Sequence, residues 1–206
     1  MHPYLSRLGV PIEVQSFFRP FHHPDPRGNL IFSYGDAVEH FGFAFHKIPN
    51  PDEFWMAGNL NRHMISDVFI AGSAMECIAF LSLHPTWLTK EDHILFLSMG
   101  TLPKNSQLEW ICRNLGNKTY HLLFGRDLLG RGCDLKVAAA LRGWPIEIAV
   151  MDEVVQVVFR HAIYTFQTNR FSLHAFEKAA GYRFAMRTHK SNKADTYLSQ
   201  VLATAF

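Results

Sequence analysis

The sequence contains few cysteines and has little net charge. Its three cysteines, at positions 77, 112 and 133, include no CxxC pair. Structural zinc sites usually draw on closely spaced cysteine and histidine ligands, so we expect no such site here. An odd number of widely spaced cysteines also favours a reducing compartment. The formal net charge is only +2, so the overall charge indicates no particular class of partner.

Common catalytic and phosphate-binding signatures are also missing. The twelve histidines show no HxxxH or HExxH spacing, and the chain has neither GxSxG nor GxxxxGK[ST]. Residues 1–20 lack a basic start followed by an apolar run, and no apolar stretch approaches the length of a membrane span. We therefore expect a cytoplasmic protein with no membrane partner.

The composition of the chain is that of a folded protein. Hydrophobic residues make up 48% of the 206 residues, charged residues 18%, and phenylalanine occurs 18 times. This length suits one large domain or two small ones, and the composition predicts an aromatic-rich core.

The hydrophobic pattern divides the chain into three segments. Residues 1–66 predict a small β-rich N-terminal cap, with strands at 30–34 and 40–46 around a Gly35-Asp36 turn and an edge strand at 54–56. Residues 67–150 predict an α/β core. Residues 151–206 predict a basic, mainly helical C-terminal extension.

The α/β core shows strands alternating with helices. Strands are expected at 67–70, 94–98, 120–124 and 145–150, and helices at 74–83, 105–115 and 134–142. This alternation predicts a mainly parallel sheet flanked by helices. In the extension we expect helices at 154–168, 172–180 and 195–205, with Ser172 as an N-cap and Gly181 as a stop. The β-branched run within 154–158 is also compatible with a strand.

Two motifs of the core carry a family resemblance. The first is Val68-Phe-Ile-Ala-Gly72-Ser73-Ala-Met-Glu76, and the second is Leu123-Phe-Gly125-Arg126-Asp127. In these motifs the core resembles the Toprim domain of bacterial primases, topoisomerases and related nucleases. The likeness is greatest to the primase-like Toprim proteins of bacterial mobile elements. The resemblance implies a Toprim-like fold and a process linked to DNA priming.

Two positions depart from the family pattern. The resemblance implies a glutamate where this chain has Gly72, and an Asp-x-Asp motif where it has Gly125 and Asp127. Phosphoryl transfer on Mg²⁺ needs such carboxylates to hold the ion. With two of them replaced by glycine, we expect a catalytically degenerate protein with no cofactor. Glu76 and Asp127 are the remaining candidates for weak metal binding or catalysis. Glu76 is read more simply as a solvated or capping acid, and Asp127 as a helix cap or a partner of Arg126 or Arg131.

Basic residues suggest a direct contact with phosphate instead. Residues 160–193 contain seven Lys or Arg against one acid, Glu177. A nucleic-acid backbone is the partner that such a surface fits. The candidate binding residues are Ser73, Arg126, Arg131, Arg187, Lys190 and Lys193. Aromatic residues interleave with this basic run and either stack on bases or belong to the core: Tyr164, Phe166, Phe171, Tyr182 and Phe184.

Two alternatives remain open at this stage. In the first, Glu76 and Asp127 re-form an active Mg²⁺-dependent phosphotransferase, nuclease or primase site with Asp134 or Asp195. In the second, the chain is a protein-interaction domain or homodimer without nucleic acid. Its interface would use aromatic residues of the N-terminal segment, if they are exposed: Phe17, Phe18, Phe21 and Trp55.

Overall fold

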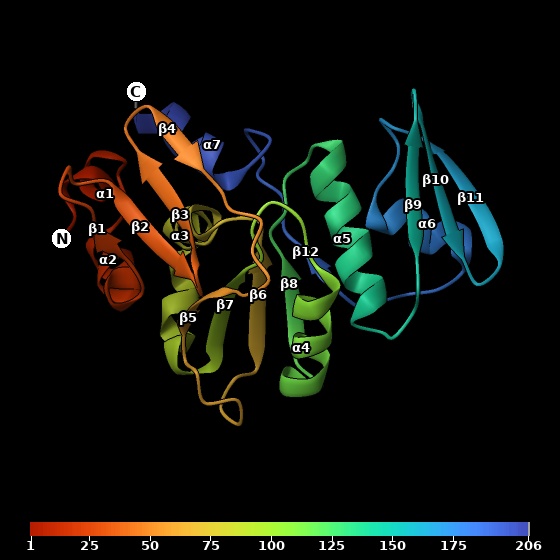
Figure 1. Cartoon of the computed structure of the whole chain (residues 1–206), viewed down its shortest axis with the longest axis horizontal. Coiled ribbons are helices and arrows are strands. Elements are labelled where there is room, and N and C mark those ends of the chain that lie inside the picture. The colour runs from red at the N-terminus through yellow and green to blue at the C-terminus, as the bar shows by residue number, and fades with distance from the viewer. Residues whose placement is uncertain (206) are drawn as a thin grey trace.

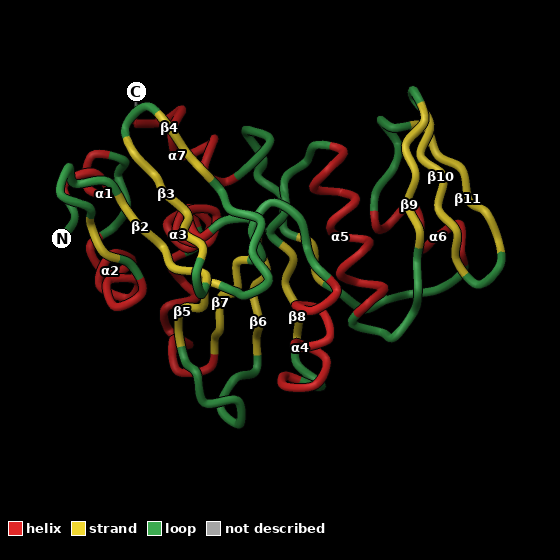
Figure 2. The backbone as a smooth tube through the Cα atoms, viewed as in Figure 1, coloured by secondary structure: helices red, strands yellow, loops and turns green. Residues whose placement is uncertain are grey.

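The computed structural model describes residues 1–205 and shows a mixed α/β protein with three sheets (Figure 1). A central five-stranded sheet lies between a four-stranded sheet built by the N-terminal segment and a three-stranded sheet near the C-terminus. Only the central sheet contains parallel strands, and the other two are antiparallel. The strands of all three sheets are yellow in Figure 2. The predicted α/β class is confirmed. The sheets are nevertheless mostly antiparallel or mixed, so the prediction of a mainly parallel sheet holds only for the centre.

The central sheet has the strand order β12-β8-β6-β7-β5. Its parallel part consists of β6 (Asp67–Ala71), β7 (Ile94–Ser98) and β8 (Thr119–Leu122), with β12 (Arg187–Thr188) added along β8. The other edge is β5 (Trp55–Gly58), which pairs antiparallel with β7. The edge strand expected at 54–56 therefore belongs to the central sheet.

Helices cover both faces of the central sheet, and its inner strands are therefore buried. Every residue of β6 and β7 is buried, as expected for strands that are covered on both sides. One face packs against α3 (Ala74–Leu83), and the other packs against α4 (Asn105–Leu115) and α5 (Leu128–Ala140). The predicted bounds of α3 and α4 are confirmed. Helix α5 begins six residues earlier than predicted, because Asp127 caps its N-terminus.

The N-terminal segment begins with helices, which the sequence did not predict. These are α1 (Pro3–Arg7), α2 (Ile12–Phe18) and the short 3-10 helix η1 (Arg19–Phe21). A second 3-10 element, η2 (Pro85–His93), follows α3 in the central unit.

The four-stranded sheet follows these N-terminal helices along the chain. Its strands are β1 (His23–Pro24), β2 (Leu30–Tyr34), β3 (Ala37–Gly42) and β4 (Phe45–Lys47). The turn at Gly35-Asp36 is confirmed, but the chain folds back again after Gly42. The stretch predicted as one strand at 40–46 is therefore split between β3 and β4.

The C-terminal segment corrects two predictions. Residues 154–168 form the hairpin β10 (Val154–Phe159) and β11 (Ala162–Gln167), so the helix expected there is wrong. The strand expected at 145–150 is β9 (Glu147–Met151), and it pairs with β10 rather than with the parallel sheet. The β-branched residues of β10 alternate between its two faces, with Val155 and Val157 in the core, and this pattern suits a strand.

Two helices complete the segment, which is therefore not mainly helical. Helix α6 (Leu173–Ala180) packs against the three-stranded sheet, and α7 (Tyr197–Ala205) packs against α3 (Figure 1). The predicted N-cap at Ser172 is confirmed, since its side chain accepts a hydrogen bond from Ala175 N. No helix within residues 1–205 is long and apolar enough to cross a bilayer.

Candidate functional site

A pocket of about 400 Å³ opens at the carboxyl ends of the parallel strands. This edge of an α/β sheet is where ligands usually bind. The lining includes Gly72 and Ser73 after β6, Gly125 and Asp127 after β8, and Glu76 in the first turn of α3. The fold thus brings three of the predicted site residues together with both glycines at which the resemblance expects carboxylates.

The N-terminus of α3 is occupied by a side chain from another element. Ser73 caps the helix by accepting a hydrogen bond of 3.1 Å from Glu76 N. The carboxylate of Glu39, on β3, accepts hydrogen bonds from Ala74 N at 2.7 Å and Met75 N at 3.2 Å. These amide groups are the ones that would hold an anionic ligand. The carboxylate of Glu39 therefore occupies the position at the N-terminus of α3 where a phosphate was predicted to bind beside Ser73.

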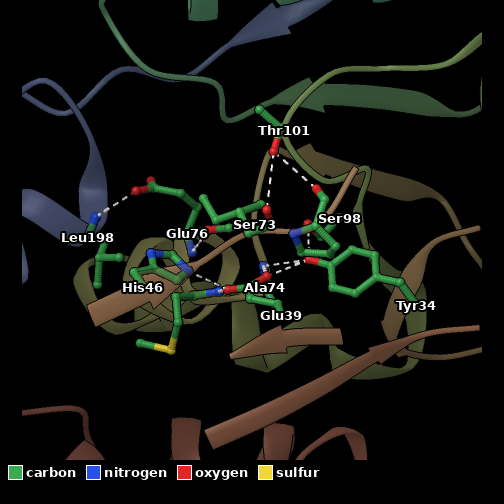
Figure 3. A network of polar contacts seen from close by, with 12 residues as sticks. Tyr34, Glu39, His46, Ser73, Ala74, Glu76, Ser98, Thr101 and Leu198 are labelled. Atoms are coloured by element: carbon green, nitrogen blue, oxygen red, sulfur yellow. Dashed lines mark hydrogen bonds and ion pairs between the residues drawn. The ribbon is translucent and has the colours of Figure 1, made fainter. Parts of the chain in front are cut away.

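Glu39 is fully buried, and side chains satisfy the rest of its carboxylate (Figure 3). The Tyr34 hydroxyl donates to one oxygen at 2.5 Å, and His46 Nε2 lies 2.8 Å from the other. Tyr34 Oη is also 2.6 Å from Ser98 Oγ at the end of β7. Burial and the neighbouring carboxylate raise the pKa of Tyr34, which keeps its hydroxyl protonated as a donor. Paired in this way, a buried carboxylate is stable in the core.

Glu76 caps a helix that lies far along the chain. Its two oxygens accept hydrogen bonds from Tyr197 N at 3.0 Å and Leu198 N at 3.1 Å, at the start of α7. Burial raises the pKa of Glu76, and the hydrogen bonds from α7 oppose this shift. Glu76 is thus a capping acid, as one reading of the sequence had it. It is half-buried, however, and the helix that it caps is α7 rather than its own.

Asp127 caps the third helix at the pocket. Its Oδ1 accepts a hydrogen bond of 2.8 Å from Gly130 N in the first turn of α5. This confirms the expectation that Asp127 is a helix cap. The N-termini of α3, α5 and α7 therefore meet at one pocket, and each is neutralised by one carboxylate, from Glu39, Asp127 and Glu76 respectively. Helix dipoles that would attract an external anion are already compensated inside the protein.

The structure within residues 1–205 contains no group of three or more His, Cys, Asp or Glu side chains placed to hold a metal ion. The two further acids considered from the sequence lie elsewhere or are engaged. Asp134 pairs with Lys190 Nζ at 2.5 Å, and burial raises its pKa to about 7 although Lys190 opposes the shift. Asp195 accepts the backbone N–H of Arg126 through its carbonyl at 2.8 Å and does not line the pocket.

Three of the predicted phosphate-binding cations donate to backbone carbonyls. Arg126 Nη1 donates to Ser191 O at 2.9 Å, and Arg131 Nη1 donates to Phe171 O at 2.9 Å. Lys190 Nζ donates to the carbonyls of both Phe124 and Gly125. None of the three side chains lines the pocket, so Arg126 does not take the place of the missing carboxylates. Arg126 and Lys190 thus hold the segment around residue 190 against the end of β8, whereas Arg131 binds the segment around residue 170.

The other two predicted cations lie on the surface. Arg187 is exposed on the edge strand β12, and Lys193 is exposed in the loop before α7. They belong to a larger set of exposed cations of the C-terminal segment that form no ion pair within residues 1–205: Arg170, Lys178, Arg183, Arg187 and Lys193.

The aromatic side chains expected to interleave with these cations belong to the core. Phe171 and Phe184 are buried, and Tyr164, Phe166 and Tyr182 are half-buried against the same core. Base stacking on Phe171 and Phe184 is therefore excluded by their burial.

The aromatic residues considered for a protein interface are also packed inside. Phe18 and Trp55 are buried, and their rings stack with centroids 5.9 Å apart. Phe17 and Phe21 pack half-buried against the same cluster. The condition set for that interface, exposure of these four aromatic residues, is therefore not met.

Sequence reasoning missed Glu39 and His46. A usable signal was present in the hairpin, since Glu39 stands two residues before Phe41 and so shares its face of the strand. A carboxylate on the core-facing side of a strand requires buried donors. The identity of those donors depends on the tertiary fold and could not be read from the sequence.

Comparison of the chain with models of known protein families, with curated proteins and with solved structures finds no match. The resemblance to the Toprim domain is therefore a prediction from the sequence motifs alone.

Proposed function

We propose that this protein is a nucleic-acid-binding module, linked to DNA priming or mobile-element processes, with a Toprim-like but non-catalytic core. The observation that carries the proposal is the use of Glu39, Glu76 and Asp127 as helix caps. Glu39 and Glu76 accept backbone N–H groups through both oxygens, and Asp127 accepts one through Oδ1. A metal-dependent reaction would need those oxygens as ligands.

The arrangement of the strands supports the Toprim-like part of the proposal. Gly72 follows β6 and Gly125 follows β8, and these two strands are neighbours in the parallel part of the sheet. Carboxylates at the two positions would lie at the same edge, as a shared metal ion requires. With glycine at both positions, the backbone arrangement of such a site is present but the carboxylate ligands are missing.

The surface of the C-terminal segment supports the binding part. Its exposed cations have no carboxylate partners among the described residues, so neutralisation by a phosphate backbone costs no existing ion pair. Such contacts are independent of sequence and weaken as salt displaces the condensed counterions.

Fluorescence anisotropy with labelled single- and double-stranded DNA tests this function. We expect binding at about 50 mM salt that falls steeply as the salt concentration rises. The paired substitution Arg187→Gln with Lys193→Gln should lower the slope of log K against log salt by about 2. The matched control is Arg27→Gln with Lys47→Gln, which removes two exposed cations of the N-terminal segment and should leave the slope unchanged. Failure of the protein to bind either DNA at low salt would refute the binding function.

Calorimetry with Mg²⁺ tests the alternative of an active metal enzyme. We expect no tight binding of Mg²⁺ by the unaltered protein, because both oxygens of Glu76 and one oxygen of Asp127 accept backbone N–H groups. Tight binding that disappears in Asp127→Asn would show that the pocket is a metal centre and would overturn the non-catalytic proposal.

A further inference from the structure

The guanidinium group of Arg160 lies among aromatic rings at the end of the β10–β11 hairpin. Its Cζ is 3.8 Å from the ring centroid of Trp144, 4.4 Å from that of Tyr182 and 5.0 Å from that of Phe159. Trp144 Nε1 donates a hydrogen bond of 2.9 Å to Tyr182 Oη, which fixes the two nearest rings relative to each other. Arg160 is nevertheless an exposed residue, so part of this side chain faces solvent.

The turn that presents Arg160 has an unusual backbone. Arg160 and His161 join β10 to β11 with φ values of +50° and +64°. Two-residue hairpin turns of this kind favour asparagine and glycine, because other residues are strained at positive φ. Strain of this kind is concentrated at binding sites, where a side chain must be held in one place.

A pocket of about 610 Å³ lies beside this turn, between the hairpin and helices α4 and α5. Its polar lining contains the cations Lys136 and Arg160, together with His161 and a single carboxylate, from Glu147. Lys136 Nζ uses one donor on Pro103 O at 2.7 Å, which leaves donors for a ligand. The pocket thus combines an aromatic and guanidinium surface with excess positive charge.

We propose that this pocket binds one nucleotide unit of a single-stranded nucleic acid. The base stacks on the solvent-facing side of the Arg160 guanidinium, which Trp144 supports from behind, and the adjoining phosphate lies near Lys136. Bases of single strands stack on aromatic rings and on arginine planes, whereas bases of a duplex are already stacked on one another. The inference rests on the proposed function, and it adds a preference for single strands and a place where one base is held.

Anisotropy with a single-stranded oligonucleotide and with its duplex tests the inference. Arg160→Lys keeps the charge but removes the flat guanidinium group, so binding of the single strand should weaken about tenfold. Binding of the duplex should change by less than about twofold, because only the single strand offers a free base. Arg183→Lys is the matched control, since Arg183 is exposed in the same segment and has no aromatic ring around its guanidinium among the described contacts.

The fluorescence of Trp144 gives a second measurement on the unaltered protein. Adenosine monophosphate should quench tryptophan emission, ribose 5-phosphate should not, and the quenching should disappear in Trp144→Phe. Quenching that persists in Trp144→Phe would overturn the inference. So would a mononucleotide that binds as tightly as the oligonucleotide, because the ligand would then be a free nucleotide.

The two proposals fail in different ways. DNA binding by the unaltered protein together with wild-type binding by Arg160→Lys would refute only the stacking site. Equal losses for the single strand and the duplex in Arg160→Lys would also refute it. Absence of any DNA binding would refute the proposed function itself.

Discussion

Glu39 accepts a hydrogen bond of 2.7 Å from the backbone N–H of Ala74, and this contact joins the N-terminal hairpin to the first helix of the central sheet. The donor and the acceptor are 35 residues apart in the sequence. A carboxylate in this position does for α3 what a bound anion would do, since it satisfies free amides and opposes the helix dipole. The N-terminal amide groups of α3 therefore need no bound anion to be satisfied.

Replacing Glu39 with glutamine should destabilise the protein strongly. Glutamine keeps the shape but has one acceptor oxygen in place of two, and its NH₂ group would face donors. We expect the free energy of unfolding to fall by about 3 kcal/mol, because buried donors are left without an acceptor. Urea denaturation followed by circular dichroism measures it. Glu91→Gln, on the exposed η2 segment, should change stability by less than about 0.5 kcal/mol; a similar small change for Glu39→Gln would show that the buried network contributes little.

Two glycines of α5 should respond oppositely to alanine. A Cβ at Gly130 would lie 2.3 Å from Gly125 O and 2.6 Å from Gly125 N, whereas a Cβ at Gly132 would meet nothing within 4 Å. Gly130→Ala should therefore cost about 1–3 kcal/mol through overpacking. Gly132→Ala should stabilise the helix by up to about 1 kcal/mol. Thermal unfolding of both variants compares the two effects, and a gain in stability for Gly130→Ala would contradict the tight packing of α5 against the end of β8.

Acid should weaken the protein through a chain of two histidines. His121 Nε2 lies 2.8 Å from Asp67 Oδ1, and His121 Nδ1 lies 2.8 Å from His189 Nε2. Burial, with the nearby His121, His84 and Arg187, lowers the pKa of His189 to about 4. An unfolded histidine titrates near 6.5, so the unfolded state binds the proton first as the pH falls. The contribution of His189 to stability is thus complete above about pH 6.5 and is lost between pH 6.5 and 4.

Urea denaturation of His189→Gln at several pH values checks this effect. The variant cannot take up the proton, while its amide N–H can still donate to His121. Between pH 7 and pH 4 it should lose less stability than the unaltered protein, by on the order of 2 kcal/mol. Parallel losses in the two proteins would show that His189 does not contribute to the pH dependence.

Placing carboxylates at positions 72 and 125 should create a metal site if the backbone of the pocket is arranged as in a Toprim active site. A Cβ at Gly72 would have ordinary contacts, the nearest being 3.6 Å from Gly100 O. At Gly125 the space is tighter, with Asp127 Oδ1 at 3.1 Å, so a small shift is needed. We expect Gly72→Glu with Gly125→Asp to bind Mg²⁺ measurably by calorimetry, because clustered carboxylates are its preferred ligands.

The matched control for this restoration places one acid outside the pocket. Gly72→Glu with Gly132→Asp adds the same charge, but Gly132 does not line the pocket. This control should bind Mg²⁺ no better than the unaltered protein. Equal binding by the two double variants would mean that added charge, and not the geometry of the pocket, holds the ion.

The parts of the fold that could be predicted are those set by local pattern. The apolar strands β6 to β8 and the helices α3 and α4 follow from hydrophobic runs and periodicity over a few turns. The caps at Asp127 and Ser172 follow from residue type. The helix expected at 154–168 was wrong, because its β-branched residues form a strand that pairs with β9 and β11.

The candidate site was only partly predictable for a different reason. Ser73, Glu76 and Asp127 lie next to strand ends, so the rule for parallel sheets brought them to one edge. The partners that decide their chemistry come from distant elements, as Glu39 does for α3 and α7 does for Glu76. Arg126 shows why such partners cannot be predicted from sequence neighbours. Asp127 is adjacent to it in the sequence, but the side chain of Arg126 donates to Ser191 O.

The contact between Glu76 and α7 spans 121 residues, and this separation affects the order in which the protein matures during synthesis. At about 5–20 residues per second, the ribosome needs about 6–24 s to make the chain between Glu76 and its partner amides. Throughout that interval α3 carries an unpaired carboxylate, and the apolar groups that α7 later covers stay open to water. Synthesis of α7 is therefore the step after which Glu76 can meet its amide partners and this apolar surface can be buried.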